Sequence, residues 1–302
     1  MIQINRQVLS LVSASFLLGA VSFGQSFEPA YSATPSLANS VAQSSNAEAL
    51  VEQGNAKYAW QDYRGAIADY SDAIRLNPKY VDAYTSRGVA KSKLGDKQGA
   101  IADYSDAIRL NPNYFLAYFN RGIVKDDLGD KQGAITDYNE AIRLNPKYVT
   151  AYNNRGSTKY DLGDKQGASV DYNEAIRLNP KYAKAYYNRG VTKVDLGDKQ
   201  GAIADYSEAI RLNPKYADPY HGRGIVKDDL GDKQGAISDY NEAIRLNPKY
   251  ADAYYNRGIV YKQLGENGKA LADYREAARL YQQQGKTSDY DDAQNLIREL
   301  GG

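Results

Sequence analysis

Apolar and polar residues follow the same order along most of the chain, with a period of 34 residues. One tyrosine marks this period seven times, at Tyr70, Tyr104, Tyr138, Tyr172, Tyr206, Tyr240 and Tyr274. The segment LNP keeps the same interval and ends at Pro78, Pro112, Pro146, Pro180, Pro214 and Pro248. A constant period of this size predicts a stacked array of short units rather than independent domains.

Within each unit, the spacing of apolar residues predicts two helices. In the first unit, Ala66, Ile67, Tyr70, Ala73 and Ile74 fall on one face at helical spacing, which is typical of a helix that packs on one side. The array therefore predicts an all-α fold.

The segment between the two helices carries the signals of a helix end and a helix start. In the unit 149–182, Gly163 follows the first segment, and Gly accepts the left-handed backbone that ends a helix. Asp164 comes next and is a favoured N-cap for the second segment. Pro180 stops the second segment, because Pro cannot continue a helix.

The sequence LGDKQGA occurs five times without change, starting at Leu94, Leu128, Leu162, Leu196 and Leu230. Its Gly, Asp and Lys could form a phosphate-binding loop or the turn between two helices. A phosphate site is needed once, whereas a turn is needed in every unit. A further copy, LGENGKA, keeps the turn Gly and an acidic cap but loses the Lys and the Gln. We interpret the segment as a turn, whose late Gly-Ala allows close packing.

Six units carry an Arg just before a Gly in the middle of the first helix, and an Asp 16 residues after that Arg. The Arg residues are Arg87, Arg121, Arg155, Arg189, Arg223 and Arg257, and the Asp residues are Asp103, Asp137, Asp171, Asp205, Asp239 and Asp273. They could pair between the two helices of one unit, or the Arg row could bind acidic groups of a ligand. Because every unit keeps both, we expect the ion pair.

The N-terminus differs from the array. Residues 1–24 carry one positive charge, at Arg6, followed by an apolar stretch and small residues, which is the pattern of a secretory signal peptide. Cleavage is expected after Gly24, or as late as Ser32. An uncleaved anchor is the alternative, but the apolar stretch is short and interrupted by Ser. Residues 25–46 are rich in small polar residues and are expected to be a disordered lead-in.

Composition and charge argue against several functions. The chain has no Cys, which excludes disulfides, thiolate metal sites and Cys nucleophiles. With 38 Lys and Arg against 37 Asp and Glu, it has no basic excess with which to bind nucleic acid. His221 has no Ser, Cys or metal-ligand partner at a useful spacing, and we interpret it as a surface residue without a catalytic role.

Two pairs of neighbouring aspartates, Asp126-Asp127 and Asp228-Asp229, suggest a metal site. Neighbours on a helix point about 100° apart, however, and no further ligands follow at a recognisable spacing. We expect a solvated face here, and no metal, cofactor or enzymatic activity.

Taken together, these positions resemble the tetratricopeptide repeat. In the unit 149–182 the resemblance rests on Gly156, Ala168, Tyr172, Ala175 and Pro180. It implies a right-handed superhelical α-solenoid of seven helix–turn–helix repeats. The repeats are 47–80, 81–114, 115–148, 149–182, 183–216, 217–250 and 251–284. The segments NRG and DYNEAIRLNP resemble a subtype common in cyanobacterial proteins.

Residues 285–302 resemble the capping helix that often closes such arrays. Tyr290, Ala293, Ile297 and Leu300 give this segment one apolar side that can cover the last repeat. We expect Ser288 to be its N-cap.

In this family the residue before the Arg faces a groove, and four units have Asn there: Asn120, Asn154, Asn188 and Asn256. The row resembles the asparagine ladder of the O-GlcNAc transferase repeats, which grips a peptide backbone. An amide offers an acceptor and two donors, so it can pair with a peptide unit. Alternatively, these amides bond to the adjacent helix or to water. Further candidates for partner contact are Phe119, Tyr187, Tyr255, Tyr160, Asp126 and Asp228.

The resemblance implies a scaffold that binds an extended peptide or a partner protein in its groove. Two alternatives remain, a structural homo-oligomer formed through the array ends and a non-catalytic partner of a separate enzyme. We expect no nucleic acid or small-molecule substrate and no stable membrane span after removal of the signal. The expected location is extracytoplasmic: the periplasm, the medium or, for a cyanobacterial protein, the thylakoid lumen.

Overall fold

The structure is a computed structural model that describes the backbone of residues 35–301 and the side chains from residue 45 onward. The expected signal segment, with both expected cleavage positions, lies outside the described residues. Within residues 35–301 the chain forms helices and no strand. The helices are α1 (Pro35–Ala59), α2 (Tyr63–Leu76), α3 (Val81–Lys93), α4 (Lys97–Leu110), α5 (Phe115–Asp127), α6 (Lys131–Leu144), α7 (Val149–Asp161), α8 (Lys165–Leu178), α9 (Ala183–Asp195), α10 (Lys199–Leu212), α11 (Ala217–Asp229), α12 (Lys233–Leu246), α13 (Ala251–Gln263), α14 (Asn267–Gln283) and α15 (Thr287–Glu299).

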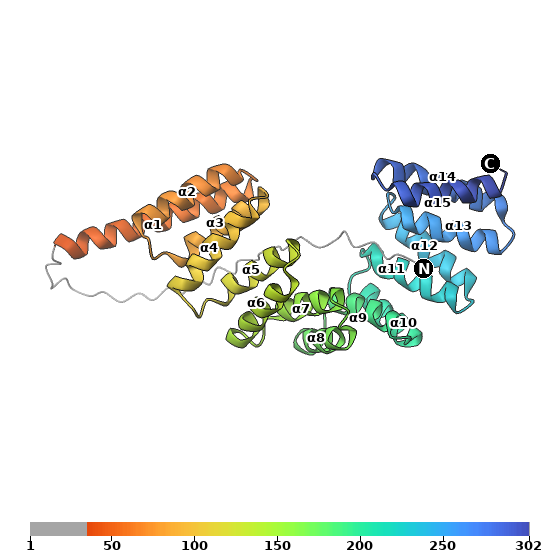
Figure 1. Ribbon diagram of the computed structural model, residues 1–302, viewed down its shortest axis with the longest axis horizontal. Helices are drawn as coiled ribbons and strands as arrows, with labels where there is room; N and C mark the ends of the chain where they lie inside the picture. The colour runs from red at the N-terminus through yellow and green to blue at the C-terminus, as the bar shows by residue number, and fades with distance from the viewer. Residues whose placement is uncertain (1–34, 302) are drawn as a thin grey trace. The chain divides into compact units, whose positions relative to one another are not determined.

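Consecutive helices pack against each other from α2 to α15 (Figure 1). Each first helix from α3 onward also contacts the first helix of the next unit, as α7 does with α9. No comparable contact joins consecutive second helices in the described part of the chain. The first helices are therefore the more closely spaced side of the stack. The predicted all-α array of helix pairs, closed by one further helix, is confirmed.

The core is built from Ala and Tyr. In α8, Ala168, Tyr172 and Ala175 are buried, and the tyrosine ring lies against α7. A Cβ atom on Gly156 would lie 2.8 Å from Cε1 of Tyr172, closer than side-chain carbons approach. The glycine in the middle of α7 is therefore needed because the ring of its own unit passes there.

The turn between the two helices follows the predicted pattern. Gly163 has φ +88°, and the carboxylate of Asp164 accepts a hydrogen bond from the backbone N–H of Gly167 at 2.8 Å. A Cβ atom on Gly167 would lie 2.0 Å from Oδ2 of Asp164. We expected this late glycine to allow close helix packing. That reason is wrong, because the capping carboxylate occupies the space.

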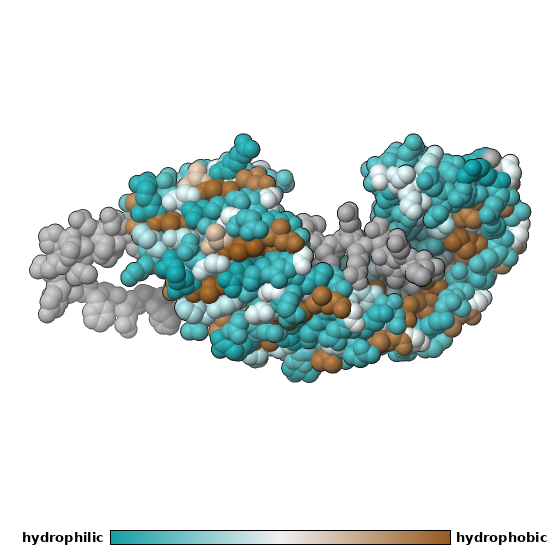
Figure 2. All heavy atoms as spheres, in the orientation of Figure 1, coloured by the Kyte–Doolittle hydropathy of each residue, from teal (hydrophilic) through white to brown (hydrophobic). Residues whose placement is uncertain are grey.

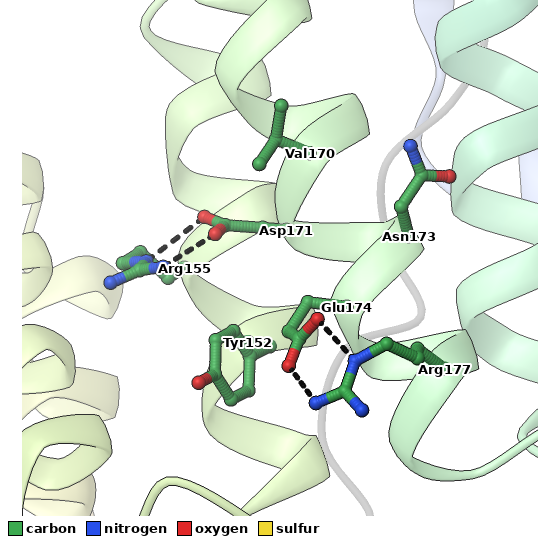
Figure 3. A pocket seen from close by; sticks show the side chains of 7 residues that line it. All are labelled: Tyr152, Arg155, Val170, Asp171, Asn173, Glu174 and Arg177. Carbon is green, nitrogen blue, oxygen red and sulfur yellow. Dashed lines mark hydrogen bonds and ion pairs between the residues drawn. The ribbon is translucent and has the colours of Figure 1, made fainter.

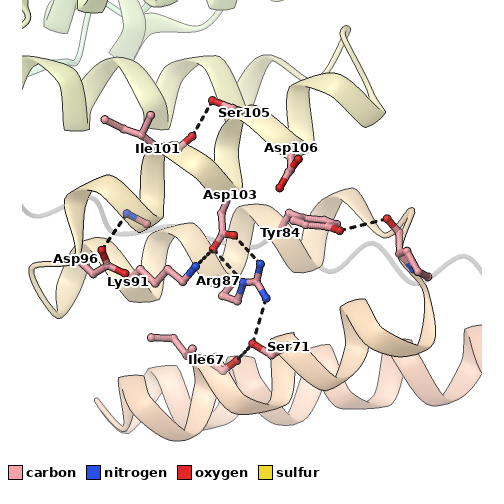
Figure 4. Close-up of polar contacts among 12 residues, drawn as sticks. Ile67, Ser71, Tyr84, Arg87, Lys91, Asp96, Ile101, Asp103, Ser105 and Asp106 are labelled. Carbon is pink, nitrogen blue, oxygen red and sulfur yellow. Dashed lines mark hydrogen bonds and ion pairs between the residues drawn. The ribbon is translucent and has the colours of Figure 1, made fainter.

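The Arg and Asp rows form ion pairs, as expected. Nη2 of Arg87 lies 2.6 Å from Oδ1 of Asp103, and Nε donates to Oδ2 at 3.0 Å (Figure 4). Nη1 donates to the Ser71 hydroxyl of the preceding unit at 3.2 Å, and Lys91 adds a second ion pair at 2.8 Å. The same Arg–Asp pair recurs in the five later units. Each pair therefore joins two helices and also reaches back to the unit before.

The Lys of LGDKQGA links neighbouring units, which the sequence did not reveal. Lys131 lies 2.9 Å from Asp161 at the end of α7, and Lys199 lies 2.5 Å from Asp229 at the end of α11. An Asp at a helix C-terminus is unfavourable beside the negative end of the helix dipole. The Lys of the preceding unit offsets this repulsion.

Both ends of the array differ from expectation. We expected residues 25–46 to be disordered, but α1 begins at Pro35. Pro is favoured at the first helical position, and no Gly or Pro interrupts the residues that follow until Gly54. At the other end, α15 begins at Thr287 with Lys286 as its cap residue, not Ser288. Gly285, with φ +70°, ends α14 and sets this earlier start.

Candidate functional site

One face of the first helices forms a continuous surface. In α7 the Arg155 side points at α8 and carries the ion pair with Asp171. Successive residues of a helix are rotated by about 100°, so a different set of residues lies on the side of α7 that is turned away from Arg155. We call this surface the first-helix face. In α7 it consists of Thr150, Asn154, Ser157, Tyr160 and Asp161, with Asn153 fully buried beneath them, and the other first helices contribute the residues 34 positions apart.

The asparagine row lies where neighbouring first helices meet. Nδ2 of Asn188 donates to Oδ1 of Asn153 at 3.0 Å, and Nδ2 of Asn256 lies 2.9 Å from Nε2 of His221. Asn154 accepts from Nδ2 of Asn153 at 3.4 Å. The amides thus bond partly to the adjacent helix, as the alternative interpretation expected. Asn188 and Asn256 each use one N–H group in these bonds, and Asn154 uses its carbonyl oxygen, so part of each amide is left for a ligand.

The aromatic candidates are mainly packing residues. Phe119 is 1% exposed and packs edge to face on Tyr148, with 4.8 Å between ring centroids. The expectation of partner contact is therefore wrong for Phe119. Tyr187 and Tyr255 are half-buried, and Tyr187 packs on Tyr216 at 5.3 Å. Only the exposed parts of these two rings can touch a ligand.

The acidic and phenolic candidates already have partners. Asp126 lies 3.3 Å from Lys131, and Asp228 lies 2.5 Å from Lys233. Tyr160 donates a short hydrogen bond to Asp195 of the next unit. These contacts neutralise much of the acidic charge of the first-helix face. Among the residues with described side chains, no group of three or more His, Cys, Asp or Glu could hold a metal ion.

His221 is buried, contrary to our interpretation as a surface residue. It is 7% exposed because Tyr250 covers its ring at a centroid distance of 4.7 Å. An amide N–H of Asn256 donates to Nε2, which places the imidazole proton on Nδ1, facing the Tyr250 hydroxyl at 3.1 Å. Burial lowers the pKa of His221 to about 4, against the raising effect of Asp252. The ring is a neutral packing group with satisfied nitrogens.

Lys184, near the start of α9, stands out among the cations of this face. It is half-buried, and desolvation lowers its pKa with no carboxylate raising it. The sequence interpretation did not single it out. The signal was available, because the equivalent position holds Asp218 and Asp252 in the next two units.

A pocket of about 480 Å³ lies on the other side of the fourth unit, lined by residues of α7 and α8 (Figure 3). Its charged residues pair with one another, Arg155 with Asp171 and Arg177 with Glu174. Val170 is exposed at its edge. The pocket is the open space over two ion pairs that recur in other units, so it gives no reason to expect a ligand.

Apolar residues on the visible surface form small patches between hydrophilic ones (Figure 2). No helix in the described residues is long and apolar enough to cross a bilayer.

Two family models match the array. One, described as "TPR repeat", matches residues 54–95, 127–163, 156–197 and 229–265. The other, described as "Tetratricopeptide repeat", matches residues 81–114, 183–216 and 251–284. A search of curated proteins found no match.

Solved structures share the fold. A tetratricopeptide repeat protein from Parabacteroides merdae is 20% identical, with a TM-score of 0.63, over 85% of this chain and 100% of that one. MamA is 30% identical, with a TM-score of 0.50, over 57% of this chain and 94% of that one. YrrB, described as a TPR protein with an unusual peptide-binding site, is 19% identical, with a TM-score of 0.51, over 62% and 97%.

Proposed function

Because this chain belongs to the tetratricopeptide repeat family, we propose that it is a non-catalytic adaptor that binds an extended segment of a partner protein along the first-helix face. Proteins of this family generally mediate protein–protein interaction or bind peptides. The signal-like N-terminus supports an extracytoplasmic location, where such an adaptor would help to assemble a complex.

The observation that carries this proposal is the row of asparagine amides on closely spaced helices. Asn188 and Asn256 each bond to the preceding first helix through one N–H group, which fixes the orientation of the amide. The remaining donor and acceptor can pair with peptide groups whatever the side chains of the ligand are. An extended backbone laid across successive units would meet these amides one after another.

The test compares two sets of amide deletions in the full chain. Peptides selected from a display library on the unchanged protein are titrated against a variant with Asn120, Asn154, Asn188 and Asn256 replaced by Ala. The matched control replaces four exposed amides of the second helices, Gln98, Gln132, Gln166 and Gln200, by Ala.

We expect the asparagine variant to lose at least about tenfold in affinity, since several hydrogen bonds of about 0.5–1.5 kcal/mol each are removed. The glutamine variant should bind as the unchanged protein does. Equal affinity of all three proteins would show that the partner binds elsewhere. Circular dichroism melting of each variant checks that the array is still folded.

A further inference from the structure

The fourth unit interrupts an otherwise apolar row on the first-helix face. One turn after each asparagine position, most first helices carry Val or Ile: Val89, Ile123, Val191, Ile225 and Ile259. The fourth unit has Ser157 there, and it has Asn153 where the third and fifth units have Phe119 and Tyr187. Asn153 is fully buried, so the exposed face of α7 is polar through Asn154 and Ser157, with apolar residues on both sides along the array.

The polar residues of α7 and α9 form a chain of oriented amides. Asn188 donates to Asn153, which in turn donates from its own Nδ2 to Oδ1 of Asn154. Ser157 accepts a long hydrogen bond, 3.5 Å, from the Tyr172 hydroxyl, so its own O–H is available to donate. The buried Asn153 thus orients Asn188, whose second N–H remains as a donor at the junction of the fourth and fifth units.

Lys184 is a cation on the same helix as Asn188, the first of these hydrogen-bonded amides. Lys184 and Asn188 are four residues apart and so share one side of α9. Lys184 makes no ion pair or side-chain hydrogen bond with the described residues, whereas Lys131 and Lys233, at the starts of α6 and α12, pair with carboxylates. A half-buried ammonium without a partner is unfavourable, and an anionic ligand would relieve that cost.

The spacing of the first helices sets how a ligand would pass this junction. Packed helices lie about 8–10 Å apart, and an extended chain rises about 3.3 Å per residue. About three residues of an extended segment therefore cover one unit. Ile123 on α5 and Ile225 on α11 each lie about one and a half units from the junction of α7 and α9. Apolar side chains about four residues before and after the residue at the junction would reach them.

We propose that the junction of α7 and α9 is a subsite for an Asp or Glu side chain of the partner, flanked on both sides by apolar residues about four positions away. This inference rests on the proposed function, since it places the acidic residue within the extended segment that the first-helix face would bind. Lys184 would pair with the carboxylate, and Asn188, one turn further along α9, would donate a hydrogen bond to it. An internal residue fits better than a chain end, because apolar positions continue in both directions from the junction.

The experiment selects peptides on the full chain from a random library whose members have both termini linked or blocked. Parallel selections use the unchanged protein, Lys184→Met, which keeps an apolar stem without the charge, and Lys215→Met as a matched control in an exposed turn. A further library with free C-terminal carboxylates is selected on the unchanged protein.

We expect the unchanged protein and Lys215→Met to enrich peptides in which Asp or Glu is flanked by apolar residues. On Lys184→Met the acidic preference should vanish and the apolar preference remain. For one selected peptide, replacing its Glu by Gln should weaken binding at least about fivefold in the unchanged protein and not in Lys184→Met.

Two results would overturn the subsite and leave the adaptor function standing. One is enrichment of peptides without an acidic residue, and the other is binding only of peptides with a free C-terminal carboxylate. If folded protein enriches no peptide from any library, the proposed function fails and the subsite with it.

Discussion

Arg189 and Asp205 form a two-pronged ion pair between the two helices of the fifth unit. Nε of Arg189 donates to Oδ2 of Asp205 at 2.8 Å, and Nη2 donates to Oδ1 at 2.6 Å. The Arg side chain is 18% exposed and the Asp side chain 5%. Nη1 reaches Asn173 of the fourth unit at 2.7 Å. The pair therefore stabilises both a unit and its junction with the preceding unit.

Replacing Arg189 by Ala should destabilise the array by roughly 1.5–3 kcal/mol, because Asp205 loses two charge-assisted hydrogen bonds but keeps its ion pair with Lys193 at 2.9 Å. The matched control is Arg211→Ala, which removes an exposed guanidinium paired with Glu208 within one helix and should change little. Chemical denaturation followed by circular dichroism measures both. Equal midpoints for Arg189→Ala and the unchanged protein would contradict a stabilising role for the pair.

The turn of the first unit contains a strained residue. Gln61 has φ +63°, in the left-handed region, where the later units have a glycine such as Gly95. Because a side chain makes this conformation costly, Gln61→Gly should stabilise the first unit by about 1 kcal/mol. The control Gln98→Gly replaces a residue inside α4. It should destabilise the second unit by a similar amount, because Gly is a poor helix former. Hydrogen exchange of the first unit is the measurement, and faster exchange in Gln61→Gly would count against strain.

The last unit contains a buried hydroxyl group without a partner. Tyr274 is fully buried, and its hydroxyl makes no hydrogen bond with the described residues. In the first unit, Tyr70 donates to Asn55 at 2.8 Å. Tyr274→Phe should leave stability unchanged or raise it by up to about 1 kcal/mol, whereas Tyr70→Phe should lower it by about 1 kcal/mol. Thermal melts of both variants check this. A larger loss in Tyr274→Phe would point to a partner for that hydroxyl.

The sequence predicted the repeated parts of the fold because their causes are local. The left-handed turn at Gly163 and the cap at Asp164 depend on residues close in the chain. The pairing of Arg189 with Asp205 was predicted as well, since a fixed separation in every unit indicates a contact within the unit.

Contacts between units were harder to predict, because a 34-residue period does not say which residues of neighbouring units meet. The Lys131–Asp161 pair and the bond from Asn188 to Asn153 are such contacts. The burial of Phe119 and His221 was missed for a different reason, because it depends on a contact within the unit between residues 29 positions apart. Each is covered by the tyrosine that ends its own unit, Tyr148 or Tyr250, and this tyrosine follows the second helix.

The stability of the array should depend on pH through His221. Burial lowers its folded-state pKa to about 4 from a usual value of 6.5. At pH well above 6.5 the imidazole is neutral in both states, so it adds no pH dependence there. As the pH falls from 6.5 to 4, the unfolded chain takes up a proton that the folded chain does not. The folded state should therefore lose roughly 2–3 kcal/mol over this window.

His221→Asn is the matched variant, because the equivalent position of the fourth unit is Asn153, which accepts a hydrogen bond from Asn188. An Asn at position 221 can accept from Asn256 in the same way and does not titrate. Urea denaturation at pH 7, 5.5 and 4.5 should show a smaller loss of unfolding free energy in His221→Asn than in the unchanged protein. Carboxylates titrate in both proteins, so only the difference between them reports on His221. Parallel pH profiles would mean that the imidazole is protonated in the folded state, with its bond to Asn256 reversed.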